Sequence, residues 1–274
     1  MPKCNMKAVV FDLDDTIGHF EELGIFTSGL KIFANREIHN EAFFKLLALF
    51  PKFIRPGILG TLRALKRAKA KDPCLKVIIY TNNMGEREWT LRIKRYLERT
   101  IGTPSHPAKL FDRVVTAYRP GKTGCRTTHR KTYSDLLRCT GLPKGTKILF
   151  LDDQLHHDMK TPDVTYLHLH PYNYAVPFPH MVHRFINSPL GQAIPRKRRT
   201  QFVRFMVSYL GSKMGQYQYV VRKTHISKRD MQQKAHIEKQ LKFFLHHQQK
   251  KTHKTRRRGR KSGKKGTRRR KKHH

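Results

Sequence analysis

Three aspartates follow a short apolar run near the start of the chain. Residues 7–11 read Lys-Ala-Val-Val-Phe, and Asp12, Asp14 and Asp15 come directly after them in the string Asp-Leu-Asp-Asp-Thr. The apolar run has the composition of a buried central strand, which three carboxylates cannot continue. We therefore expect the aspartates at the carboxyl end of that strand, where an open α/β sheet binds ligands, with a cation or a lysine to offset their charge. Taken alone, the run is also consistent with a solvated acidic turn.

Five strand-like runs are spaced along the first two thirds of the chain, at residues 7–11, 76–80, 110–118, 147–151 and 164–169. The second run ends in Thr81-Asn82-Asn83 and the fourth in Asp152-Asp153, so polar residues follow these strands as they follow the first. Between the runs, apolar residues recur at helical spacing. Strands that alternate with helices predict an α/β fold with a mostly parallel central sheet flanked by helices.

Three further segments lie outside this alternation. Residues 17–53 mix glycines with apolar residues and form a small insertion after the first strand. Residues 186–249 form a basic helical extension that we expect to pack on the main domain or on a partner. Residues 250–274 contain 15 Lys and Arg and no acid, so nothing there repays the entropy of ordering, and we expect a disordered tail. The predicted organisation is a main domain over 1–185, followed by the extension and the tail.

Basic residues dominate the composition. Lys and Arg outnumber Asp and Glu by 58 to 19, which gives a formal net charge of +39 and implies a polyanionic partner. After Leu190 the only acidic residues are Asp230 and Glu238. A tail this rich in cations is typical of a nuclear import signal or of a contact with RNA or DNA, although a solvated cationic run is the simpler alternative. No aromatic residue is interleaved in the tail, so base stacking is not indicated.

The four cysteines and the apolar runs bear on the compartment. Cys4, Cys74, Cys125 and Cys139 form no CxxC pair, so the spacing favours neither a disulfide framework nor a structural zinc site. We expect Cys125 and Cys139 to be packing residues in a protein of a reducing compartment. No apolar run approaches the roughly 20 residues of a membrane span, so we expect a soluble, intracellular and nuclear protein with no membrane partner.

The order of the polar strand ends resembles the haloacid dehalogenase (HAD) superfamily of aspartate-based phosphotransferases. The resemblance covers about residues 7–169, and its motifs are Asp12 with Asp14, then Thr81, then a lysine, then Asp152 with Asp153. Within the superfamily, the chain is similar to the branch that contains the RNA polymerase II carboxy-terminal-domain phosphatases and the NLI-interacting-factor-like phosphatases. The additional residues that carry this similarity are His19, Arg55-Pro56-Gly57, Tyr80, Asn82, Cys125, Lys131 and Asp135-Leu136.

The chain departs from that branch in three respects. Lys131 is followed by Thr132 rather than by Asp, and the interval from Lys131 to Asp152 is longer than in the branch. The insertion over 17–53 is also larger than in the minimal members. These departures concern the choice of substrate more than the chemistry.

The resemblance implies a Rossmann-like HAD fold and magnesium-dependent hydrolysis of a phosphate monoester through an aspartyl-phosphate. It implies Asp12 as the nucleophile and Asp14 as the proton donor and later the base. Asp12, Asp152 and Asp153, with the backbone carbonyl of Asp14, are the implied ligands of Mg²⁺. Thr81 and Asn82 would bind the phosphoryl oxygens, Lys131 would neutralise their charge, and Thr16 would fix the turn.

Several of these residues have other interpretations. Thr81 and Asn82 are also ordinary turn residues, and Lys122 in a Gly-rich loop is a second candidate for the phosphate-site lysine. Histidines at 156, 157, 168 and 170 could suggest zinc, but they lack companions at metal spacing. At the level of function, a protein Ser/Thr phosphatase is the first hypothesis. The alternatives are a polynucleotide terminal phosphatase and a catalytically weak nucleic-acid-binding scaffold.

Overall fold

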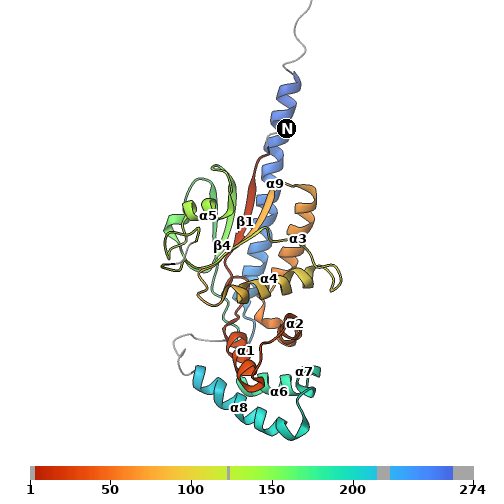
Figure 1. Cartoon of the computed structure of the whole chain (residues 1–274). Helices are drawn as coiled ribbons and strands as arrows, with labels where there is room; N and C mark the ends of the chain where they lie inside the picture. The colour runs from red at the N-terminus through yellow and green to blue at the C-terminus, as the bar shows by residue number, and fades with distance from the viewer. Residues whose placement is uncertain (1–3, 122–123, 215–222, 262–274) are drawn as a thin grey trace, which may run out of the picture.

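A parallel β-sheet forms the centre of the computed structural model, which describes residues 4–121, 124–214 and 223–261 (Figure 1). The strand order is β3-β2-β1-β4-β5, and every neighbouring pair is parallel. The α/β fold with a parallel central sheet is therefore confirmed. The strands are β1 (Lys7–Phe11), β2 (Leu75–Tyr80), β3 (Arg113–Val115), β4 (Lys147–Asp152) and β5 (Val164–His168).

Helices cover both faces of this sheet, as the alternating side chains of its buried strands require. Val9 and Phe11 of β1 point to the face covered by α3 (Ile58–Lys71), α4 (Arg87–Ile101) and α9 (Lys228–Lys261). Ala8 and Val10 point to the opposite face, where α5 (Tyr133–Thr140) packs through Leu136. The short 3₁₀ helix η2 (His157–Met159) joins β4 to β5.

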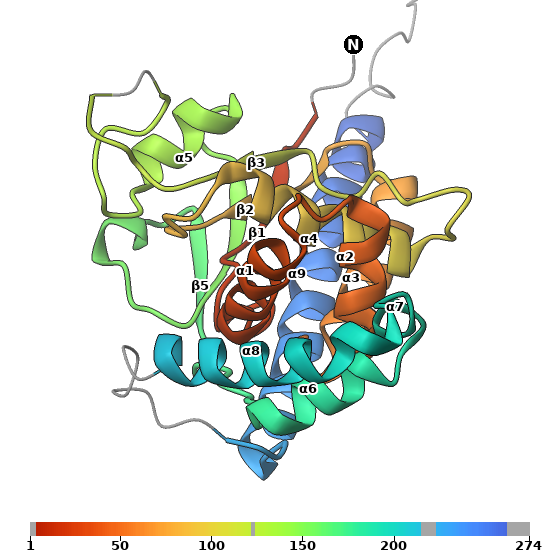
Figure 2. The same cartoon turned by 60° about the horizontal axis from the view of Figure 1, so that its bottom comes forward.

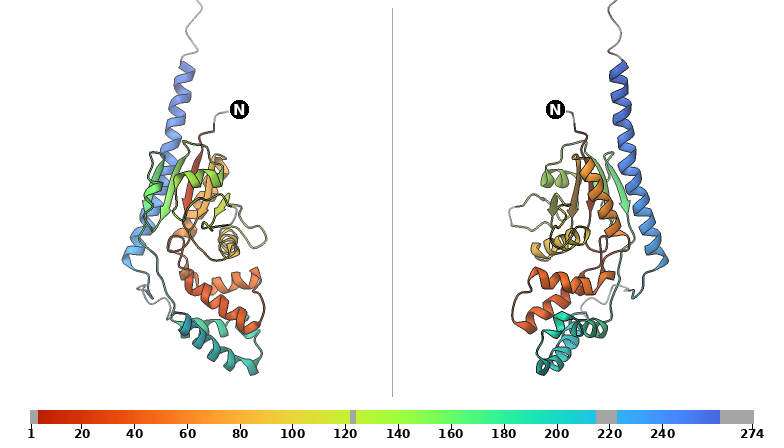
Figure 3. Two further views of the ribbon diagram at one scale, coloured as in Figure 1. Left: turned by 60° about the vertical axis from the view of Figure 1, so that its left-hand side comes forward. Right: turned by 90° about the vertical axis from the view of Figure 1, so that its right-hand side faces the viewer.

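The remaining helices form a separate layer beyond the carboxyl end of β1, which we call the helical layer (Figures 2 and 3). It combines the insertion after β1 with part of the segment that follows β5, so residues far apart in the sequence meet there. Its members are α1 (Glu21–Ala34), α2 (Asn40–Leu49), the 3₁₀ helix η1 (Pro51–Phe53), α6 (Phe178–Ile186), α7 (Pro189–Gln192) and α8 (Arg196–Met214).

Aromatic side chains and a glycine join α1 to α8 within the helical layer. The Phe33 and Phe202 rings meet edge to face with centroids 5.0 Å apart. A Cβ added at Gly29 would lie 2.9 Å from Tyr209 Cδ1 and 3.0 Å from Met206 Sδ, so the close approach needs glycine. Helix α1 is not predicted from the sequence, because glycines are typical of loops. The need for Gly29 becomes clear only from its packing against α8.

The basic extension divides between two sites. Helix α8 packs on α1 and α6, whereas α9 packs on α3 through Ile237, Leu241 and Phe244. Both contacts agree with the expectation that the extension packs on the main domain. Helix α9 continues to Lys261, so residues 250–261 are helical where the sequence analysis expects disorder. Lys, Arg and Gln are good helix formers and extend a helix that tertiary packing has already started. Residues 262–274 lie outside the described residues.

The cysteines depart from their expectation. Two disulfides join Cys4 to Cys74 and Cys125 to Cys139. Cys4 lies shortly before β1, and Cys74 lies directly before β2. These two strands pair in parallel with Lys7 opposite Leu75, which brings the two cysteines together. The prediction that the cysteines are unpaired packing residues is therefore wrong. The cysteines do not support the expected reducing compartment. None of the helices that the structure describes has the length and apolar character of a membrane span.

Candidate active site

Three carboxylates meet at the carboxyl edge of the two central strands. Phe11 lies opposite Leu151 in the register of β1 and β4, so the following residues, Asp12 and Asp152, lie side by side. Oxygens of Asp12, Asp152 and Asp153 all lie within 4.8 Å of one another. The backbone N–H of Asp12 donates to Leu151 O at 2.9 Å and fixes this arrangement. The structure thus brings together three of the four predicted metal ligands through their side chains.

Lys131 reaches this acidic group from the loop before α5. Its Nζ lies 2.5 Å from Asp12 Oδ1 and 2.7 Å from Asp152 Oδ2, and its side chain is only 2% exposed. Burial lowers the pKa of Lys131, but the charges of the two aspartates and their hydrogen bonds outweigh burial and raise it. The lysine is therefore a fixed cation against the aspartates. Lys122, the second candidate, lies outside the described residues.

Asp14 occupies a different position from the three clustered carboxylates. Its Oδ2 accepts a hydrogen bond from Asn83 Nδ2 at 2.7 Å, and its side chain lines a cavity. Burial raises the pKa of Asp14 to about 6, although the Asn83 hydrogen bond opposes the shift. A carboxyl group with a pKa near neutral can both donate and accept a proton, which is what general acid–base catalysis requires.

Asp153 is held by Thr16 across the two central strands. Thr16 Oγ1 donates to Asp153 Oδ1 at 2.9 Å and accepts the Asp153 backbone N–H at 3.0 Å. Burial and the nearby Asp12 charge raise the pKa of Asp153 to about 7, although the Thr16 hydrogen bond opposes them. Thr16 therefore connects the loops after β1 and β4, which is more than the turn-fixing role predicted for it.

The donor set of this cluster fits a magnesium ion. Oxygen ligands are those that Mg²⁺ prefers, and Lys131 offsets the charge of two of the three carboxylates, Asp12 and Asp152. The histidines at 156, 157, 168 and 170 form no group of three or more candidate ligands within the described ranges. His156 Nε2 instead lies 3.5 Å from Asp152 Oδ2, and His168 Nε2 contacts the Asp153 backbone oxygen at 2.9 Å.

The first residues after strand β2 are Thr81 and Asn82. Thr81 is 1% exposed, and its Oγ1 accepts the Asn83 backbone N–H at 3.0 Å. That bond leaves the hydroxyl hydrogen free to donate to another oxygen. Asn82 Oδ1 accepts from Arg126 Nη1 at 2.8 Å, so its amide is oriented by this guanidinium. Thr81 and Asn82, the residues predicted to bind phosphate, are therefore oriented by hydrogen bonds from Asn83 and Arg126.

Two buried arginines hold the loops around the site. Arg55 is 1% exposed and donates to the backbone oxygens of Thr16, Asp15 and His170. Arg55 is expected only from the family resemblance, and Arg126 is not predicted from the sequence. Arg126 lies in a polar loop that contains several other arginines and lysines, and no periodicity or motif distinguishes it there.

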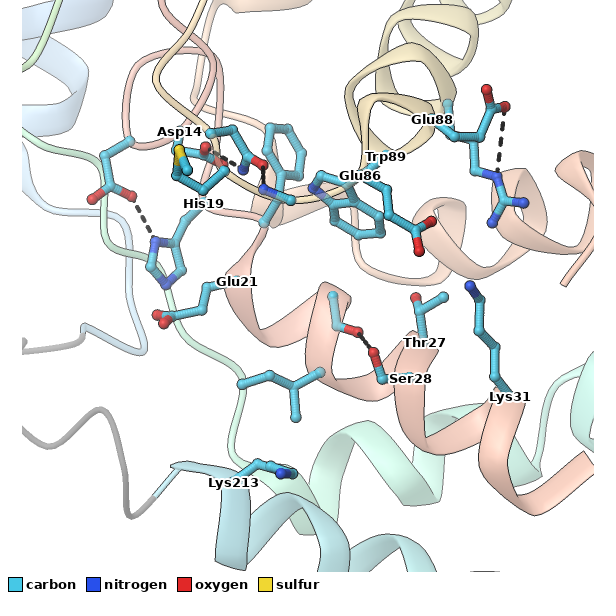
Figure 4. Close-up of a pocket in the computed structure, with 18 of the residues that line it drawn as sticks. Asp14, His19, Glu21, Thr27, Ser28, Lys31, Glu86, Glu88, Trp89 and Lys213 are labelled. Atoms are coloured by element: carbon cyan, nitrogen blue, oxygen red, sulfur yellow. Dashed lines mark hydrogen bonds and ion pairs between the residues drawn. The ribbon is translucent and has the colours of Figure 1, made fainter. Parts of the chain in front are cut away.

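A cavity of about 730 Å³ opens beside Asp14, between α1, the start of α4 and the end of α8 (Figure 4). His19 also lines the cavity and contacts Asp15 Oδ1 through Nδ1 at 2.7 Å. Lys31 and Lys213 line the part of the cavity formed by the helical layer. Trp89 lies between Asp14 and Lys31 (Figure 4). The cavity therefore leads from Asp14 into the helical layer, where a group attached to a bound phosphate could lie.

The fold and the site together define a class: an α/β protein whose parallel sheet carries a carboxylate and lysine centre at its carboxyl edge. No family model matches the sequence, and no curated protein matches it. Two crystal structures of CbbY from Rhodobacter sphaeroides are similar to this chain, one in complex with phosphate and one, a mutant, in complex with xylulose-(1,5)bisphosphate. Their identities are 15% and 14%, and each alignment covers 59% of this chain and 93% of the other with a TM-score of 0.27.

Proposed function

We propose that this protein is a magnesium-dependent phosphomonoester hydrolase that works through an aspartyl-phosphate on Asp12. One observation carries the proposal: at the edge of a parallel sheet the Asp12 carboxylate contacts the Lys131 ammonium group and lies within 4.8 Å of the carboxylates of Asp152 and Asp153. This arrangement combines a nucleophile, a fixed cation and an oxygen-rich metal site within a few ångströms. Such groups suit the hydrolysis of a phosphate monoester, whose uncatalysed reaction is among the slowest known and which therefore needs a strong nucleophile and positive charge around the transferring group.

The residues divide the reaction between them. The Asp12 carboxylate attacks phosphorus, and the bond from phosphorus to the leaving oxygen breaks. Asp14, whose pKa is raised to about 6, donates its proton to that oxygen and then takes a proton from the water that hydrolyses the aspartyl-phosphate. Lys131 and the Thr81 hydroxyl face the phosphoryl oxygens and stabilise their charge.

The residues that would hold the metal are Asp12, Asp152 and Asp153, with the Asp14 backbone carbonyl. Bound there, Mg²⁺ supplies Lewis-acid stabilisation of the phosphoryl oxygens. Thr16 keeps Asp153 in the orientation that the cluster needs. Arg55 fixes the backbone on which Asp12 and Asp14 lie, because it binds the carbonyls of Asp15 and Thr16.

A phosphorylated protein is the substrate class that we propose first. Support comes from the resemblance of the motifs to the carboxy-terminal-domain phosphatase branch. The specific observation that favours a second class, a polynucleotide terminal phosphate, is the formal net charge of +39. A catalytically weak scaffold is disfavoured because Asp12 and Asp14 are both present, and an inert relative could lose either.

Phosphopeptides and 3′-phosphorylated oligonucleotides, assayed side by side with Mg²⁺ and with EDTA, test these proposals. We expect faster release of phosphate from phosphopeptides, loss of release in EDTA, and no release by Asp12→Asn. Asp158→Asn is the matched control, because Asp158 is an exposed aspartate of the loop after β4 that no role in the site involves. Faster release from oligonucleotides would favour the second class, and equal rates for Asp12→Asn and the unaltered protein would refute the mechanism.

RNA or DNA as a partner, and a nuclear location, are also proposals, and the Lys/Arg-rich tail supports both. If 6 to 10 cations contact phosphates, binding should weaken by about 10³ to 10⁵ between about 50 and 200 mM salt. A response to salt that is nearly flat would contradict the nucleic-acid contact.

A further inference from the structure

The Arg126 guanidinium organises the loop that delivers Lys131. Arg126 is 5% exposed, and its Nη2 donates to three successive backbone oxygens, those of Thr128, His129 and Arg130, at 3.2, 2.9 and 2.9 Å. The loop is therefore curled around this one guanidinium. The next residue along the chain is Lys131, so the curl decides where the lysine side chain begins.

The other side of the same guanidinium holds the end of strand β2. Nη1 donates to Thr81 O at 3.2 Å and to Asn82 Oδ1 at 2.8 Å. The guanidinium also lies over the Tyr80 ring, 4.9 Å from its centroid, and the Tyr80 hydroxyl accepts the Thr132 backbone N–H at 3.2 Å. Arg126 thus spans two segments, the polar end of β2 and the loop before α5, which the Tyr80–Thr132 hydrogen bond also links.

We propose that Arg126 is a positioning residue that sets the distance between Lys131 and the pair Thr81 and Asn82, and so the geometry of the phosphate-binding half of the site. The inference rests on the proposed function. A planar guanidinium can donate in several fixed directions at once, whereas a lysine in its place is a point charge with no fork. The identity of the side chain is therefore as important as its charge.

The loop has other anchors, so loss of Arg126 should misplace Lys131 without unfolding the protein. Thr127 donates to the buried Asp135 carboxylate through its backbone N–H at 2.9 Å and its hydroxyl at 2.8 Å. The disulfide between Cys125 and Cys139 ties the start of the loop to α5. None of the hydrogen bonds that Arg126 makes in the described structure goes to Asp12, Asp152 or Asp153, so Arg126 acts on these carboxylates only through Lys131.

Kinetics of Arg126→Lys and Arg126→Gln test the proposal on an aryl phosphate. We expect kcat to fall by about 10²-fold in both variants, the typical cost of a catalytic group misplaced by about 1 Å. The inhibition constant of inorganic phosphate should rise, because Lys131 and Thr81 no longer converge on the phosphoryl oxygens. Arg199→Gln is the matched control, because Arg199 also binds backbone oxygens, those of Ile194 and Gln192 at 3.0 Å each, but does so in the helical layer. Unaltered kinetics in Arg126→Lys would overturn the proposal.

A readout independent of activity separates this proposal from the proposed function. Lys131 is nearly inaccessible in the folded protein, so amine acylation followed by mass spectrometry should leave it unlabelled. In folded Arg126→Gln we expect labelling of Lys131, whereas Lys7, which is buried and paired with Asp72 at 2.8 Å, should stay protected. If the unaltered protein hydrolyses nothing, the proposed function fails and the labelling still decides the role of Arg126. Continued protection of Lys131 in either Arg126 variant would overturn it.

Discussion

Thr16 and Asp153 are joined by two hydrogen bonds although 137 residues separate them in the chain. The Thr16 hydroxyl donates to the Asp153 carboxylate at 2.9 Å and accepts the Asp153 backbone N–H at 3.0 Å. One hydroxyl group therefore fixes both the position and the orientation of a proposed metal ligand. The loop after the first strand and the loop after the fourth strand depend on each other for this reason.

Thr16→Val should weaken both the fold and metal binding. The buried Asp153 N–H loses its acceptor, which costs about 1–3 kcal/mol of the free energy of unfolding. Loss of an orienting partner typically costs 10–100-fold in metal affinity, so the Mg²⁺ concentration for half-maximal activity should rise by about that factor. Thr16→Ser keeps the hydroxyl and is the control. Equal Mg²⁺ dependence in the two variants would contradict the prediction.

Lys131→Met should destabilise the protein strongly in the absence of metal. The variant leaves Asp12 and Asp152 buried without their shared cation, and breaking a buried ion pair from one side costs about 3–5 kcal/mol. Denaturant unfolding in EDTA measures this cost. Because Mg²⁺ replaces part of the lost positive charge, its addition should raise the Tm of the variant more than that of the unaltered protein. A variant as stable as the parent in EDTA would show that Lys131 does not hold these carboxylates.

His19 should make stability depend on pH. Burial lowers the pKa of His19, but the hydrogen bond and charge of Asp15, with the charges of Glu22 and Glu21, outweigh burial and raise it. The folded state then binds the proton more tightly than the unfolded chain, so the contribution is fully present below the unfolded pKa of about 6.5 and is lost as the pH rises through the folded pKa. The difference in free energy of unfolding between the parent and His19→Gln should therefore be larger at about pH 5.5 than at about pH 9. A difference that grows with pH would contradict the assignment.

The two disulfides should contribute unequally to stability. Cys125 and Cys139 are 14 residues apart, and closure of a loop of about 15 residues is worth about 3 kcal/mol. Cys4 and Cys74 are 70 residues apart, so their bond should contribute more on the same argument. Denaturant unfolding of Cys139→Ser and Cys74→Ser compares them. The opposite order would show that chain entropy does not govern these two bonds.

Gly29→Leu should loosen the helical layer. A side chain at Gly29 meets Tyr209 and Met206 at 2.9–3.0 Å, and overpacking of this kind costs about 1–3 kcal/mol. Gly60→Ala in α3 is the control, because a Cβ there has no neighbour within 4 Å, and alanine in a helix is favoured over glycine by about 0.5–1 kcal/mol. The two thermal shifts should have opposite signs.

Local sequence patterns predicted the sheet and much of the candidate site. Parallel strands end at a common edge, so residues that follow them, such as Asp12, Thr81 and Asp153, could be placed together before any coordinates were known. The placement of these residues depends only on the composition of a short run and on what comes directly after it. Lys131 was implied by the resemblance to the HAD superfamily, with Lys122 as the alternative.

Other features were decided by tertiary structure. The pairing of Cys4 with Cys74, the bond between Thr16 and Asp153, and the several contacts of Arg126 join segments whose separation in sequence carries no signal. The glycine at position 29 of α1 is explained only by its packing against α8, which follows the last strand in the sequence.

Local patterning was sufficient to locate the strands and the chemical groups at their ends, because the alternation of buried side chains is a local property of the backbone. The pairing of buried polar groups needed the three-dimensional fold, because a hydrogen bond between distant segments depends on the positions of both partners. The aspartates of the site could therefore be predicted from the sequence, whereas the bond between Thr16 and Asp153 and the contacts of Arg126 could not.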